Sequence, residues 1–250
     1  MQGVLYVSHG SRVSEAAAEA MGCIASVKAD VAVGLQEICF LELASPSVEQ
    51  GIERLVCQGA SRIAIVPVLL LSAGHYYKDI PDKVAVAEKQ YPFITFTYGQ
   101  PLGVQDRFID VLTERIAETQ ISIGPATKIL LVGRGSRNPQ TKKDIEMIGN
   151  KLQRVLQTAH VEVCYLAACG PSFDEKLQSS LEADYANLIV VPYLWFTGIL
   201  MRSIDRTISE LVKPNRSVVL CQQLGDHPVM KQALKERVYE SFEMAEAITM

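Results

Sequence analysis

Short apolar runs alternate along this chain with longer stretches whose apolar residues recur at helical spacing. Runs rich in Val, Ile and Leu are typical of strands buried on both faces, as in a parallel sheet. In the first half of the chain these runs predict strands at 3–8, 34–43, 62–71 and 93–98. The intervening stretches predict helices that begin near residues 14, 46, 81 and 104. This alternation is typical of an α/β fold with helices on both faces of a parallel sheet.

One of these helices has a start signal of its own. Ser45 is the predicted cap of the second helix, and Pro46 then stands at the first helical position, where proline is well tolerated.

The second half of the chain repeats the first. LYVSHGSR at residues 5–12 recurs 125 residues later as LLVGRGSR, and FLELASPS at 40–47 recurs as YLAACGPS. Self-similarity of this kind predicts repeated structural units. We therefore expect two similar α/β lobes, residues 1–122 and 123–250, each a four-stranded parallel sheet with helices on both faces. The ligand site is expected in the cleft between the lobes, and how the terminal helices are shared stays open.

The repeat allows the lobes to be compared position by position. Three polar residues of the first lobe are replaced in the second: His9 by Arg134, Glu42 by Ala167 and His75 by Leu200. All three lie at or beyond the carboxyl ends of the first three predicted strands, where open α/β sheets bind their ligands. Their joint loss from the second lobe indicates one functional set.

The chemistry of this set is that of a metal site. Two imidazoles and a carboxylate with open coordination positions suit a divalent transition metal such as Fe, Co, Ni or Zn. A neutral imidazole also accepts protons near neutral pH. The set can therefore hold a metal, act as a general base, or do both in turn.

Composition narrows the range of partners. The 250 residues carry a formal charge of −4 without a basic block, which argues against nucleic acid as a partner. The longest apolar run, at 189–200, is too short and too polar to span a bilayer. The six cysteines form no CxxC pair, and most lie in apolar patterns, which is typical of small buried thiols in a reducing compartment. We expect a soluble, cytoplasmic protein.

Three motifs carry a resemblance to a known family. HGSR follows the first predicted strand, FLELASP accompanies the second, and PVLLLSAGH ends the third. In this order they resemble the sirohydrochlorin chelatases, and the resemblance covers essentially the whole chain. The two-lobe length is most similar to the ferrochelatases of siroheme synthesis.

The resemblance implies an ATP-independent enzyme that inserts Fe²⁺, or alternatively Co²⁺, into sirohydrochlorin and releases two protons. It implies that His9 and His75 are catalytic and bind the metal, and that Glu42 helps to hold the ion. The metal is then a substrate, and no permanently bound cofactor is expected. Because the two lobes are fused, we expect a monomer.

A polycarboxylate macrocycle also requires cations and an apolar wall. The candidates for binding it are Ser11, Arg12, Tyr76, Lys78, Arg134, Arg137 and Arg202, with Trp195 and Phe196 for the ring face. Arg12 and Arg137 recur in both lobes, which is equally consistent with bracing a turn. Arg134 takes the place of His9 and is the stronger candidate, so the second lobe is expected to clamp the substrate.

Other interpretations stay open at this point. Cobalt or nickel insertion fits the same ligands, because His and Glu do not discriminate between neighbouring divalent metals. A non-catalytic carrier of metal or tetrapyrrole is the alternative from another class. A dinucleotide-binding enzyme is disfavoured because Asn138 stands where GxGxxG requires its third glycine. A histidine phosphatase is disfavoured because Ser8 stands where its arginine belongs. His160 is expected at the surface and His227 at a helix start.

Overall fold

The computed structural model describes residues 1–157, 159–212 and 217–244. By its contacts the chain divides into two compact units. The first unit comprises Met1–Gly103 and the described residues from Met230 onward, and the second comprises Val104–Val229.

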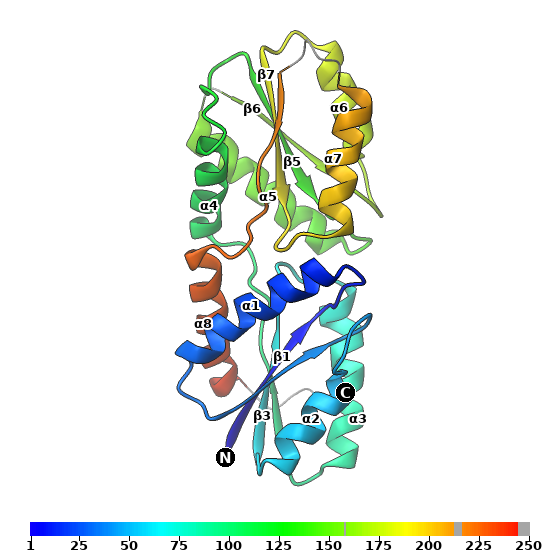
Figure 1. The fold of residues 1–250 in the computed structure, drawn as a ribbon, viewed down its shortest axis with the longest axis vertical. Helices are drawn as coiled ribbons and strands as arrows, with labels where there is room; N and C mark the ends of the chain where they lie inside the picture. The colour runs from blue at the N-terminus through cyan, green and yellow to red at the C-terminus, as the bar shows by residue number, and fades with distance from the viewer. Residues whose placement is uncertain (158, 213–216, 245–250) are drawn as a thin grey trace. The chain divides into compact units, whose positions relative to one another are not determined.

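The first unit is a four-stranded parallel sheet in the order β2-β1-β3-β4. Its elements are β1 (Gln2–Ser8), α1 (Ser14–Asp30), β2 (Leu35–Phe40), α2 (Val48–Cys57), β3 (Arg62–Pro67), the π-turn η1 (His75–Asp79), α3 (Ile80–Gln90), β4 (Thr95–Tyr98) and α8 (Pro228–Glu243). Figure 1 shows α2 and α3 on one side of this sheet and α1 with α8 on the other.

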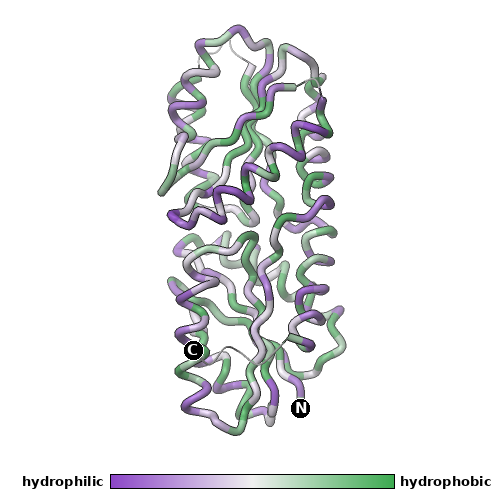
Figure 2. The backbone as a smooth tube through the Cα atoms, turned by 180° about the vertical axis from the view of Figure 1, so that it is seen from behind, coloured by the Kyte–Doolittle hydropathy of each residue, from purple (hydrophilic) through white to green (hydrophobic). Residues whose placement is uncertain are grey.

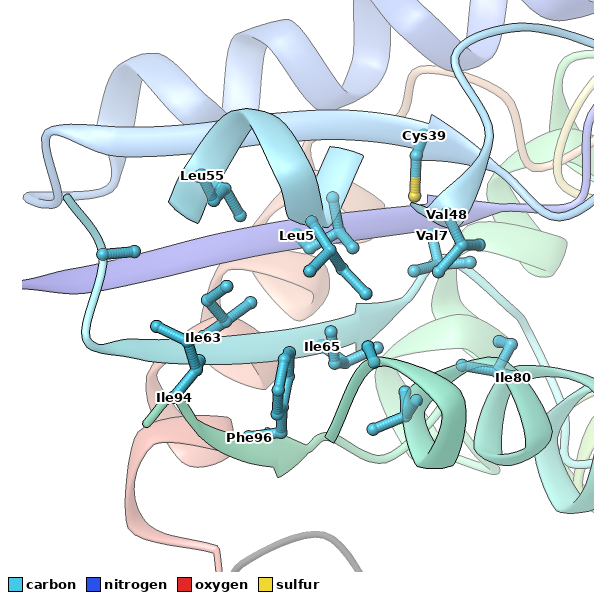
Figure 3. Packing of buried hydrophobic residues seen from close by; sticks show 14 residues of the cluster. Leu5, Val7, Cys39, Val48, Leu55, Ile63, Ile65, Ile80, Ile94 and Phe96 are labelled. Carbon is cyan, nitrogen blue, oxygen red and sulfur yellow. The ribbon is translucent and has the colours of Figure 1, made fainter. Parts of the chain in front are cut away.

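The core of this unit follows from strand alternation. Leu5 and Val7 point to the face covered by α2 and α3, where they meet Leu55 of α2 and Ile80 of α3 (Figure 3). Leu5 and Val7 are 0–1% exposed, and Val4 and Tyr6 on the other face of β1 are 0% exposed, as expected of a central strand buried on both faces. Along the backbone the hydrophobic stretches coincide with the strands, whereas the helices alternate between hydrophobic and hydrophilic residues (Figure 2).

The second unit repeats this arrangement in the order β6-β5-β7-β8, again parallel throughout. Its elements are α4 (Asp106–Ala117), β5 (Thr127–Gly133), α5 (Pro139–Leu156), β6 (His160–Tyr165), α6 (Phe173–Glu182), β7 (Asn187–Tyr193), α7 (Ile199–Leu211) and β8 (Val218–Leu220). The predicted fold class, two similar α/β units with parallel four-stranded sheets, is confirmed.

The contacts settle how the terminal helices are shared, which the sequence left open. Helix α4 follows β4 in the chain but belongs to the second unit, and α8 belongs to the first. Arg237 of α8 donates to the carbonyl of Leu102 at 2.9 Å, and Tyr239 accepts from the backbone N–H of Ala32 at 3.1 Å. The sequence predicted a boundary at residue 122 and left the sharing of the terminal helices open, and the contacts group α4, which ends at Ala117, with the second unit.

Several local expectations need correction. The cap of α2 is Ser47, not Ser45, because its side chain accepts from the N–H of Gln50 while the Gln50 side chain accepts from the N–H of Ser47. Strand β3 ends at Pro67, four residues earlier than expected. Cys57 is exposed at the end of α2, although Cys23, Cys39, Cys164 and Cys221 are buried.

Among the described residues, no helix is both long and apolar enough to cross a membrane.

Candidate metal site

The backbone brings His9 and Glu42 together. Strands β1 and β2 are paired up to Ser8 and Phe40, and the pairing continues beyond them. The N–H of Leu41 donates to the carbonyl of Ser8 at 2.8 Å, and that of Glu42 donates to the carbonyl of His9 at 3.1 Å. His9 and Glu42 therefore lie side by side, just beyond the carboxyl ends of two adjacent strands.

Gly10 makes this close approach possible. Its φ is +94°, a conformation that favours glycine. A Cβ at this position would lie 1.9 Å from the carbonyl oxygen of Glu42. The glycine of the HGSR motif is therefore required by the backbone contact that aligns the site.

His75 reaches the same place from the other side of β1. Strand β3 pairs with β1, and the chain then enters η1, a π-turn whose first residue is His75. Such single turns are frequent at functional sites. The N–H of Ile80 donates to the carbonyl of His75, five residues back. In the same pattern the carbonyl of Tyr76 would accept a hydrogen bond from the N–H of residue 81, but this residue is Pro81, which has no N–H. The carbonyl accepts instead from the hydroxyl of Tyr98 at 2.7 Å.

The three residues predicted from the repeat converge in the structure. The rings of His9 and His75 are 4.5 Å apart between centroids at an interplanar angle of 61°. Nδ1 of His9 lies 3.3 Å from a carboxylate oxygen of Glu42. Each of the three residues offers one ligand atom, and these atoms all lie within 4.8 Å of one another. This spacing suits three ligands of one divalent ion.

The site is partly open to solvent. The side chains of His75, His9 and Glu42 are 23%, 31% and 50% exposed. An ion held there therefore remains within reach of a second substrate, unlike an ion in a closed structural site.

Asp79 is a neighbour of this site that the sequence analysis missed. Its carboxylate oxygen lies 2.7 Å from Nδ1 of His75, four residues earlier. The signal was present in the sequence, because residues four apart on a helical turn face each other.

The aromatic and hydroxyl candidates have structural contacts. Tyr76 is 8% exposed and stacks on Tyr98 at 5.0 Å between centroids, whereas Tyr77 is 56% exposed. Burial raises the pKa of Tyr76 and of Tyr98, so both phenols stay protonated near neutral pH. The hydroxyl of Ser11 accepts from the N–H of Val13 at 3.0 Å, which shapes the turn after β1.

The cationic candidates point to solvent. Arg12 is exposed in the first unit, and Lys78 pairs with Asp82 at 3.3 Å. The exposed candidates of the second unit are Arg134, Arg137 and Arg202. Trp195, by contrast, is 5% exposed and stacks on Phe196 at 5.1 Å between centroids.

The two remaining histidines lie where they were expected. His160 is exposed at the start of β6. His227 precedes α8, where its Nδ1 accepts from the N–H of Val229 at 3.3 Å and its Nε2 lies 3.0 Å from Glu114.

The second unit keeps the same backbone frame without the metal-binding side chains. Gly135 has a φ of +86°, and a Cβ there would lie 1.8 Å from the carbonyl oxygen of Ala167. The N–H of Ala167 donates to the carbonyl of Arg134 at 3.0 Å, as Glu42 does to His9. The frame is therefore common to both units, and the His–Glu–His set occurs in the first of them.

Comparison with known proteins gives a consistent result. The model of the CbiX family matches residues 3–119 and again 128–241. The chain is 43% identical to a sirohydrochlorin ferrochelatase of Priestia megaterium, over 95% of this chain and 90% of that protein. It is 39% identical to the sirohydrochlorin ferrochelatase of Bacillus subtilis (strain 168), over 96% and 92% of the two chains.

Solved structures agree with this. A structure of SirB from Bacillus subtilis with Fe³⁺ superposes with a TM-score of 0.86 at 39% identity, covering 96% of this chain and 95% of that one. A complex of the chelatase SirB from Bacillus subtilis subspecies spizizenii with cobalt gives a TM-score of 0.84 at 36% identity, with 99% of each chain covered. With its duplicated sheets and its two matches to one family model, the chain belongs to the CbiX family of sirohydrochlorin chelatases.

Proposed function

We propose that this protein is a sirohydrochlorin ferrochelatase, which inserts Fe²⁺ into sirohydrochlorin without ATP to give siroheme. The observation that carries this proposal is the convergence of His9, Glu42 and His75, with all ligand atoms within 4.8 Å, in a chain 43% identical to a named ferrochelatase. The metal is a substrate, and no permanently bound cofactor takes part.

The side chains suit the chemistry of insertion. Two pyrrole N–H groups of the macrocycle lose their protons as the ion enters, so the overall reaction releases two protons. A neutral imidazole at the site is a suitable base for this transfer. Glu42 balances part of the charge of the incoming ion. Three protein ligands leave coordination positions open for the macrocycle nitrogens, so the ion can be passed on.

Binding of the macrocycle is assigned to residues around the site and in the second unit. Arg134 occupies the place of His9 in the repeated frame, and its exposed guanidinium can pair with a substrate carboxylate in a two-pronged contact. Arg137 and Arg202 are proposed to add further cations. The candidates of the first unit, which lie near His9 or His75 in the sequence, are Ser11, Arg12, Tyr76 and Lys78.

An anaerobic absorbance assay of sirohydrochlorin with Fe²⁺ tests the proposal. We expect His9→Ala and His75→Ala each to lower the catalysed rate by ~10² or more, the scale of a lost acid–base group, while the fold stays intact. His160→Ala removes an exposed histidine at the start of β6 and is the matched control. Near-normal turnover by either site variant would contradict the assignment of that histidine.

Cobalt insertion is the second candidate function. The chain is 31% identical to a sirohydrochlorin cobaltochelatase of Priestia megaterium over 97% of its length, and a related structure holds cobalt. The ratio of the Fe²⁺ and Co²⁺ rates in the same assay ranks the two metals. Tight binding of metal or pigment without acceleration over the protein-free control would instead indicate a carrier.

A further inference from the structure

Asp79 fixes which nitrogen of His75 carries hydrogen. Its Oδ2 lies 2.7 Å from Nδ1 of His75. A carboxylate has no hydrogen to give, so the bond requires that Nδ1 carries one and donates it. The neutral ring then keeps its lone pair on Nε2, the atom that a metal ion or a proton requires.

The backbone is shaped for this pair. His75 and Asp79 are the first and last residues of the π-turn η1. Residues four apart on a helical turn face each other, and in η1 the Oδ2 atom of Asp79 lies 2.7 Å from Nδ1 of His75. In the second unit the corresponding positions lie in the regular helix α7. Among the described residues, the π-turn therefore occurs in the first unit, which carries His75.

The internal repeat argues against a packing role for this carboxylate. The position 125 residues after Asp79 is Ile204, which is 0% exposed. The same place in the fold thus accepts a buried aliphatic side chain, whereas the Asp79 side chain is 44% exposed. Asp79, like His9, Glu42 and His75, is therefore replaced by a residue of another type at the equivalent position of the second unit.

We propose that Asp79 is a positioning residue that holds His75 in the tautomer and orientation needed to bind the incoming metal through Nε2. Partners of this kind are needed because an imidazole ring can otherwise rotate and exchange its tautomer. The consequence for the metal-insertion rate rests on the proposed function, whereas the consequences for the tautomer and for metal affinity do not.

The test compares Asp79→Asn with the wild-type protein. The amide has the size of the carboxylate but can also donate, so it no longer enforces hydrogen on Nδ1. Asp110→Asn, an exposed carboxylate of α4, is the matched control. Long-range ¹H–¹⁵N NMR of the metal-free protein, at a pH where imidazole is neutral, reports the tautomer of His75. The signal is assigned by its loss in His75→Gln.

We expect hydrogen on Nδ1 in the wild type and in Asp110→Asn, and hydrogen partly or wholly on Nε2 in Asp79→Asn. Titration with Co²⁺, without macrocycle, is expected to show a ~10–100-fold weaker Kd for Asp79→Asn. An unchanged tautomer and a Kd within about twofold of wild type would overturn the inference. Absence of turnover in the wild type would contradict the ferrochelatase proposal and leave these two measurements decisive for Asp79.

Discussion

Gly10 illustrates how one residue fixes the geometry of the site. It has no catalytic atom, yet its missing Cβ lets the loop after β1 lie against the carbonyl of Glu42. Its conservative replacement should therefore damage the site as strongly as the loss of a ligand.

We expect Gly10→Ala to destabilise the protein by about 1–3 kcal/mol, because φ is +94° and the new Cβ would meet the Glu42 oxygen at 1.9 Å. Displacement of that loop should also weaken Co²⁺ binding. Urea unfolding and a Co²⁺ titration measure the two effects.

Two other glycines separate these effects. Gly135→Ala creates the same clash in the second unit, at 1.8 Å from Ala167, and should lower stability while Co²⁺ binding persists. Gly22→Ala lies within α1 with no atom within 4 Å and should stabilise the helix by about 0.5–1 kcal/mol. Wild-type Co²⁺ affinity in Gly10→Ala would refute the role given to this loop.

At this scale the sequence predicted that His9, Glu42 and His75 converge but not the contact of His75 with Asp79. His9, Glu42 and His75 were found because each is replaced in the other repeat. Asp79 obeys the same rule, with Ile204 in its place, but an aspartate in an amphipathic stretch resembles any solvated helix face. What distinguishes it is the 2.7 Å distance from its Oδ2 to Nδ1 of His75, because the four-residue spacing allows this contact but does not show that it forms.

The π-turn is the element on which the site depends. Pro81 removes the N–H that the carbonyl of Tyr76 would use, and the hydroxyl of Tyr98 replaces it at 2.7 Å. A strand residue of β4 thereby supports the turn that carries His75.

We expect Tyr98→Phe to cost about 1–2 kcal/mol, because the carbonyl of Tyr76 is left without its donor. The loosened turn should also lower the rate of metal insertion. Tyr91→Phe is the control, since the hydroxyl of Tyr91 meets an exposed side chain, that of Gln90, at 3.1 Å. Urea unfolding and the insertion assay check both variants, and equal stability of the two would contradict this account of the turn.

The strands and helices were predictable from the pattern, but their ends were not. The apolar run after Pro67 suggested a longer strand, yet Leu69 and Leu70 accept from the N–H groups of Leu102 and Gly103, beyond the end of β4. For α2 the correct cap was readable, because Ser47 stands three residues before Gln50 in a capping box. Apolar character predicts burial, whereas the end of an element depends on where its hydrogen-bonding partners end.

At the scale of the whole molecule, one frame occurs twice with different side chains. Both units have the same strand order, the same glycine after the first strand and the same capping box before the second helix. The sharing of α4 and α8 was not predictable, because the positions of apolar residues in a helix do not identify the sheet that the helix covers. The two units thus share one fold, whereas the cluster of His9, Glu42 and His75 occurs in the first of them.

Replacing Arg134 tests the proposal that the second unit binds the macrocycle while the first binds the metal. If the second unit binds the macrocycle, Arg134→Ala should raise the KM for sirohydrochlorin by about 10-fold, the effect of losing one charge-assisted contact, while kcat changes little. Arg134→Lys should recover part of this loss, because an ammonium keeps the charge but not the two-pronged geometry. Steady-state kinetics at fixed metal concentration measures all three proteins.

Arg154 provides the matched control for this change. It is an exposed arginine in the last turn of α5, so it lies toward the amino ends of the strands, whereas Arg134 follows the carboxyl end of β5. Arg154→Ala removes the same charge from the same unit and should leave KM unchanged. Equal effects of the two substitutions would indicate a general contribution of net charge, and an unchanged KM in Arg134→Ala would refute the clamp. Only a selective effect of Arg134 supports the proposal that the turn after β5, which corresponds to the His9 turn of the first unit, binds carboxylates of the substrate.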